Sequence, residues 1–203
     1  MGLIQNIDLI FMLEPIIVIG FSVGTILYWH WRERVTKYVL GFSLMGYGGA
    51  IAAKVAFQYL TAPSFLLISQ GSLWLLGLYL GIQTVAFEVG GAFLVARFAV
   101  SRHKMRRSDA VAYGLGLASW ENAVLIGATS LLSLLFYSVT IAQGGMAAES
   151  VYNLLSKSQP QLFAPPLEAL QAICWSVLER ISSLMAHLSW GYLCLRSAAS
   201  HKK

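Results

Sequence analysis

The chain has 203 residues, of which 57% are hydrophobic and only 11% are charged, and its mean hydropathy is +0.66. So few polar residues cannot cover a water-soluble globule, which excludes an ordinary soluble domain and predicts an all-α, polytopic transmembrane helical bundle. The net charge of +5 comes from short basic clusters between apolar stretches. We therefore interpret it as a sign of membrane topology and expect no nucleic acid partner.

The first two apolar stretches predict two spans. The first covers residues 15–31 and ends in aromatic residues directly before the charged run 32–34. The second covers residues 38–60 and ends before Pro63, which favours a helix break. Lys54 lies in this second span, roughly 25 Å from its cytoplasmic end. We interpret it as a residue whose ammonium group snorkels to the outer membrane surface.

The third stretch can form one long span or two short ones, because Glu88 and Arg97 are its only charges between residues 65 and 100. One span over residues 70–101 puts every basic cluster on the same side, as the positive-inside rule favours. These clusters are Arg32/Arg34/Lys37, Arg102/Lys104/Arg106/Arg107 and Arg196/Lys202/Lys203. The distribution of charge therefore favours one span.

Two further spans are predicted over residues 109–142 and 167–196, separated by a polar external loop over residues 143–166. Residues 1–203 then form a single integral membrane domain of about five spans, with the N-terminus outside and the C-terminus inside. We expect a multi-pass protein of the cell membrane whose basic loops are cytoplasmic and whose surroundings are membrane lipids.

Ionisable residues inside apolar spans are the candidate functional groups, because each costs about 2.5–3.5 kcal/mol to insert there. Glu88 and Glu121 each lie 13 residues from the cytoplasmic end of their predicted span, or roughly 20 Å. His187 lies 9 residues before Arg196, or roughly 14 Å from that end. We therefore expect three separate helices to bring these side chains to one place.

Three polar neighbours are predicted to support this group. Asn122 follows Glu121 directly, and Glu179 and Arg180 lie in the last span. Arg180 precedes His187 by seven residues, or two helical turns, so it lies on the same face of the helix. We expect it to reach toward the same cluster.

Three kinds of site fit these residue types. Glu88 and Glu121 could hold and activate a water molecule while His187 stabilises the oxyanion. The same three residues match a two-carboxylate, one-histidine site for a divalent metal. They could also form an internal network of ion pairs and hydrogen bonds that fixes helix register. We expect no haem, because His30 lies at the membrane interface and His187 lies deeper.

Three stretches resemble the YhfC-type membrane peptidases, which are related to PrsW and to the CAAX-processing intramembrane proteases. FEVGGAF at residues 87–93 is similar to the family's FEExxRY, and YGLGLASWENA at residues 113–123 is similar to YGLGHGGIEA. LERISSLMAH at residues 178–187 is similar to LERxxAxxxH. The resemblance covers about two thirds of the chain, and it implies that Glu88, Glu121 and His187 activate water against a peptide bond.

The chain departs from the family pattern at three positions. Val89 stands where the family has a second glutamate, Ala92 where it has arginine, and Leu117 where it has histidine. The resemblance implies an intramembrane peptidase of the glutamate/histidine type, or a catalytically degenerate form, with a membrane protein or peptide as substrate. The departures leave open a non-catalytic membrane subunit or scaffold that packs against partner subunits of a larger complex. A small transporter, with the internal charges along its pathway, is a third hypothesis.

Overall fold

The computed structural model describes residues 5–200, and of residue 66 and residues 68–71 it describes the backbone alone. Across this range the backbone forms helices and no strand. This observation confirms the all-α class that the composition predicts.

The described chain is a series of helices with short connections. In order they are η1 (Leu9–Met12), α1 (Leu13–Glu33), α2 (Tyr38–Leu60), α3 (Ala62–Gly71), α4 (Leu73–Gln83), η2 (Thr84–Val89), α5 (Gly90–Arg102), α6 (Arg107–Ser119), η3 (Trp120–Ala128), α7 (Thr129–Gln143), α8 (Gly145–Ser158), η4 (Pro160–Phe163) and α9 (Pro166–Ser200).

Within the described residues, four helical stretches are long and apolar enough to cross a membrane: Leu9–Glu33, Tyr38–Leu60, Leu73–Arg102 and Arg107–Gln143. Such helices, with few charges, are those expected of a membrane protein. The helix α9 is 35 residues long, but it is not among the four, and it carries Glu179 and Arg180 near its middle. The number of spans and their orientation stay predictions.

The segment predicted as an external loop, residues 143–166, differs from that prediction because it contains α8 and η4. Gly144 and Gly145, with φ of 74° and 77°, make the turn before α8, and glycine adopts this left-handed conformation without a steric penalty. Ala148 and Leu155 are buried on one face of α8. The helix is therefore amphipathic, and its polar residues give the segment the composition of a loop.

The described chain divides into two compact units, which we call unit 1 and unit 2. Unit 1 contains residues 5–24 and 121–184, and unit 2 contains residues 25–120 and 185–200. All three divisions fall inside helical segments, after Gly24, after Trp120 and after Leu184. That residues 1–203 form one domain stays a prediction.

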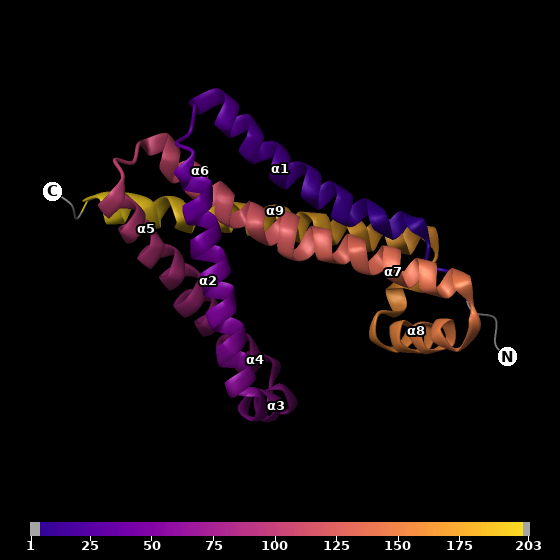
Figure 1. Ribbon diagram of the computed structural model, residues 1–203. Helices are drawn as coiled ribbons and strands as arrows, with labels where there is room; N and C mark the ends of the chain where they lie inside the picture. Colours follow the sequence, from indigo (N-terminus) through magenta and orange to yellow (C-terminus); the bar gives the residue numbers. More distant parts are fainter. Residues whose placement is uncertain (1–4, 201–203) are drawn as a thin grey trace. The chain divides into compact units, whose positions relative to one another are not determined.

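In unit 2, α2 packs against both α5 and α6 (Figure 1). Small residues let the helices of this unit approach closely. A Cβ atom built on Gly191 of α9 would lie 2.5 Å from the Cα atom of Gly114 in α6, and one built on Gly114 would lie 2.6 Å from the carbonyl oxygen of Leu188. No side chain fits at these two glycines, and such close backbone contact is a main source of helix association in lipid.

The first turn of α6 is held by a buried carboxylate. Asp109 accepts a hydrogen bond from the backbone N–H of Arg106 at 2.8 Å. It also accepts bonds from the backbone N–H and the hydroxyl of Thr36, at 3.0 and 3.1 Å. The carboxylate thus satisfies donors at the helix start and joins it to the connection between α1 and α2.

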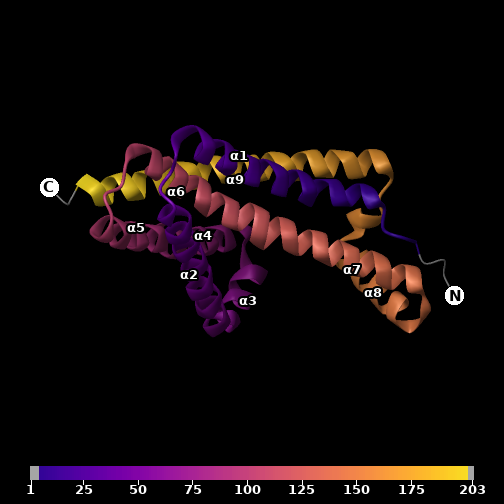
Figure 2. The ribbon, with the colours of Figure 1, turned by 45° about the horizontal axis from the view of Figure 1, so that its top comes forward.

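In unit 1, α8 folds back and packs against α7 (Figure 2). A cluster of buried apolar side chains holds this unit together: Ile7, Phe11, Ile141, Leu155, Leu162, Ala169 and Ile173. These residues come from η1, α7, α8, η4 and α9 and from the segment that precedes η1. Apolar contact therefore joins the start of the described chain to the region around α8.

Candidate active site

Both candidate carboxylates lie in π-helical segments. Glu88 lies in η2, which follows α4, and Glu121 lies in η3, which follows α6. A π-helical segment is a wider turn inserted into an otherwise α-helical stretch. Such turns are rare in proteins, and those that occur are frequently at functional sites. The sequence carries no signal for these turns, so the direction of the two side chains could not be predicted from residue spacing.

In unit 2, Glu88 forms an ion pair with Lys54 of α2. The Lys54 Nζ atom lies 2.5 Å from Oε1 of Glu88 and donates a further hydrogen bond to the hydroxyl of Thr84 at 3.1 Å. The side chains of Lys54 and Glu88 are only 17% and 10% exposed. The ammonium group therefore has protein partners, and the interpretation that Lys54 snorkels to the surface is wrong.

The reason for this error is that counting residues along a helix gives depth but not direction. Lys54 and Glu88 lie on helices that pack together, and the contact between α2 and η2 places opposite charges side by side. The only sequence signal was the opposite charge of two residues in neighbouring predicted spans.

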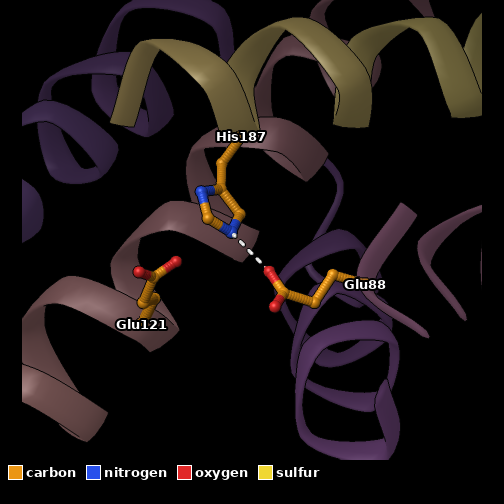
Figure 3. A group of neighbouring side chains, drawn as sticks. All are labelled: Glu88, Glu121 and His187. Carbon is orange, nitrogen blue, oxygen red and sulfur yellow. Dashed lines mark ion pairs between the residues drawn. The ribbon is translucent and has the colours of Figure 1, made fainter. Parts of the chain in front are cut away.

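The second oxygen of Glu88 faces His187. The Nε2 atom of His187 lies 3.9 Å from Oε2 of Glu88, and the two side chains point toward each other (Figure 3). The imidazole is 4% exposed. Its ring contacts those of Trp190, with centroids 4.2 Å apart, and Tyr47, with centroids 5.9 Å apart. Aromatic packing thus fixes the ring that faces Glu88.

In unit 1, Glu121 forms an ion pair with Arg180 of α9. The Nη1 atom of Arg180 lies 3.1 Å from Oε1 of Glu121, and the hydroxyl of Ser183 donates to the same oxygen at 3.3 Å. Both charged side chains are about 15% exposed. The guanidinium also pairs with Glu179, whose side chain is 70% exposed.

Asn122 adds a second link between η3 and α9. It is fully buried, and its side-chain amide donates to the backbone carbonyl of Arg180 at 3.1 Å. This bond gives one side-chain N–H of a buried residue a partner and holds the backbone at the residue that pairs with Glu121.

The structure thus brings the candidate residues together in two groups. Glu88 and His187 meet in unit 2, and Glu121, Asn122, Glu179 and Arg180 meet in unit 1. That the two groups make one site stays a prediction. The residue spacing did not predict the contacts of Lys54 and Thr84 with these groups, nor those of Ser183, Tyr47 and Trp190.

The geometry of the unit 2 group suits a metal ligand pair. Two ligands of one tetrahedral zinc-like ion, each about 2.1 Å from it, lie about 3.4 Å apart. The Nε2 and Oε2 atoms, at 3.9 Å, need a shift of about half an ångström to match this spacing. An imidazole and a carboxylate are also ligands that divalent transition metals accept.

Comparison with known proteins gives one result. The model of a family described as YhfC intramembrane metalloprotease matches residues 17–203 of the chain. No curated protein and no solved structure matches it. The family match covers most of the chain and confirms the resemblance that its three sequence stretches indicate.

Proposed function

The chain belongs to the YhfC intramembrane metalloprotease family, and on this premise we propose that it hydrolyses peptide bonds inside the membrane, with Glu88, Glu121 and His187 holding a divalent metal ion. Two carboxylates and one imidazole are a donor set that could hold such an ion. The observation that carries the proposal is the pair of ligand atoms on separate helices, Oε2 of Glu88 and Nε2 of His187.

Helix geometry supports Glu121 as the third ligand. Glu121 accepts a hydrogen bond from Ser183 of α9. His187 follows Ser183 by four residues on this same helix, so the two residues are one turn apart on one face. The bond from Ser183 joins Glu121 to the turn of α9 that precedes His187, which supports Glu121 as the third ligand.

In this proposal the bound metal would act as a Lewis acid that polarises a peptide carbonyl and activates water. The protein supplies the position of each ligand. Lys54 holds one oxygen of Glu88 and leaves the other toward His187. Arg180 and Ser183 hold Glu121, and Trp190 fixes the imidazole ring. Partners of this kind orient metal ligands, and their loss typically costs about 10- to 100-fold in metal affinity or activity.

The test uses the purified full-length chain in liposomes and a fluorogenic apolar peptide of about 20 residues, long enough to span the bilayer. We expect Glu88→Gln, Glu121→Gln and His187→Gln each to abolish cleavage and to lower bound metal per chain, measured by elemental analysis. Each replacement keeps a polar side chain but removes a ligand charge or an imidazole nitrogen.

The matched control is Glu168→Gln, which removes one carboxylate from an exposed position in the first turn of α9. It should leave cleavage and metal content unchanged. Cleavage that survives both glutamate replacements would overturn the proposal. A wild-type protein that binds no metal and cleaves nothing, but purifies with a stoichiometric companion, would support the non-catalytic subunit instead.

A further inference from the structure

Unit 1 contains a cavity of about 570 Å³ that the proposed metal site does not use. Its walls come from η1, α1, α7, η4 and α9. More than half of the residues that line it are polar, although these helices are mostly apolar. The polar residues include Glu14, Ser133, Tyr137, Gln159, Gln161 and Ser176. A volume of this size falls in the range of small-ligand sites.

Glu14 is the one charged residue among the described residues that line this cavity. It lies in the first turn of α1, and its carboxylate accepts a hydrogen bond from the hydroxyl of Ser176. Every other polar group on the wall is a hydroxyl or an amide. A ligand that carries one positive charge would therefore find a single opposite charge and several neutral hydrogen-bonding partners.

The cavity lies along the same helices as the Glu121 group. Thr129 lines the cavity and follows Glu121 by eight residues in the helical stretch of η3 and α7, or roughly 12 Å. Ser176 precedes Arg180 by one turn of α9. An extended peptide advances about 3.3 Å per residue, so a bond near Glu121 and a side chain in the cavity would be about four residues apart.

We propose that this cavity is a substrate subsite that takes a basic side chain, lysine or arginine, of a membrane-bound peptide about four residues from the cleaved bond. The proposal rests on the proposed peptidase function. Glu14 binds the cationic head, and the apolar wall residues Phe11, Leu134 and Ile173 contact the aliphatic stem. An isolated basic residue in an apolar segment is costly in lipid. The carboxylate of Glu14 would lower this cost, so the cavity would favour peptides that carry such a residue.

The binding test removes catalysis first, by placing every variant in the full chain with Glu88→Gln. The probes are fluorescent Leu/Ala peptides of about 20 residues that carry one lysine, one norleucine or one glutamate at the same position. We expect the lysine peptide to bind about 10-fold more tightly than the norleucine peptide. The net free energy of a hydrogen bond to a charged group corresponds to an affinity ratio of about this size. Glu14→Gln should remove this preference, and Glu14→Asp should restore part of it.

Glu14→Gln keeps an oxygen that can accept the bond from Ser176, so the fold should survive, and Glu168→Gln again controls for the lost charge. Equal binding of the lysine and norleucine peptides, or a preference that Glu14→Gln leaves intact, would overturn the subsite. A preference abolished by phosphatidylethanolamine but not by phosphatidylglycerol would assign the cavity to a lipid ammonium group and also overturn it. If the lysine preference is retained but the wild-type chain, with Glu88 intact, cleaves nothing, the result would count against the peptidase function alone.

Discussion

Glu88 and Glu121 lie in equivalent local structures, but the cations that pair with them differ. Each carboxylate is in a π-helical segment and pairs with a basic residue of another helix. Lys54 reaches Glu88 with a single ammonium group that also binds Thr84. Arg180 divides its guanidinium between Glu121 and Glu179, while Asn122 holds its backbone.

The type of cation determines how each carboxylate is held. A lysine is a compact point charge on a flexible stem, whereas the planar guanidinium offers several donors in a rigid fork. Glu121 therefore depends on a partner that is fixed through both its side chain and its backbone. Glu88 depends on a partner that is fixed only at its tip.

The largest expected effect comes from Arg180→Met, which leaves the carboxylate of Glu121 without its cation. Loss of one partner from a buried pair costs about 3–5 kcal/mol of stability, measurable as a lower midpoint of thermal unfolding in detergent. Glu179→Gln, the matched change at the exposed partner, should cost less than about 1 kcal/mol. Adding Glu121→Gln to Arg180→Met should recover part of the loss, and a strictly additive double variant would contradict the pairing.

Lys54→Met should have the next largest effect, about 1.5–3 kcal/mol, because it removes the charged donor of Glu88 and Thr84. Thr84→Val, which removes only the hydroxyl, should cost about 1 kcal/mol. Thermal unfolding in the same detergent measures both. If the Lys54→Met protein is as stable as the wild type, the ion pair with Glu88 would be contradicted. The result would then support the first interpretation, in which the ammonium group of Lys54 lies at the membrane surface.

The smallest expected effect concerns packing near the two π-helical segments. A Cβ atom on Gly127 would lie 2.6 Å from Ile19 Cγ1 and 2.8 Å from the backbone oxygen of Asn122, whereas one on Gly91 would lie 3.0 Å from the Cβ atom of Ala50. We expect Gly127→Ala to cost about 1–2 kcal/mol, and Gly91→Ala to cost less. Gly20→Ala, with open space around it, is the control. A larger loss of stability for Gly91→Ala than for Gly127→Ala would show that the residues around Gly127 can shift to accept a methyl group.

The candidate residues could be selected from the sequence because charge in lipid is expensive. Glu88, Glu121 and His187 belong to the few ionisable residues inside predicted spans, where this cost applies, and the structure pairs Glu88 with His187. Arg180 was predicted to reach toward the cluster, and it contacts Glu121. Lys54 carried the same cost, but a long lysine side chain can avoid it in two ways, by reaching the membrane surface or by pairing with a carboxylate. The depth of the residue in the membrane does not distinguish these two arrangements.

Other features could not be predicted, for different physical reasons. The helix α8 has an apolar face of few residues within a polar segment, so its average composition resembles a loop. The π-helical turns depend on how neighbouring helices pack and have no composition of their own. The cavity around Glu14 is lined by segments more than 100 residues apart, Phe11–Pro15 and Ala172–Ser176, so no local pattern marks it.

The amino-acid sequence is enough to predict a set of membrane helices, because long apolar stretches in lipid must satisfy their backbone groups internally. It also determined which residues needed a partner there. The partner of each carboxylate, Lys54 for Glu88 and Arg180 for Glu121, follows from the packing of the helices and not from the sequence pattern. The reason is that a side chain's direction depends on helix rotation, which packing and the π-helical turns set together.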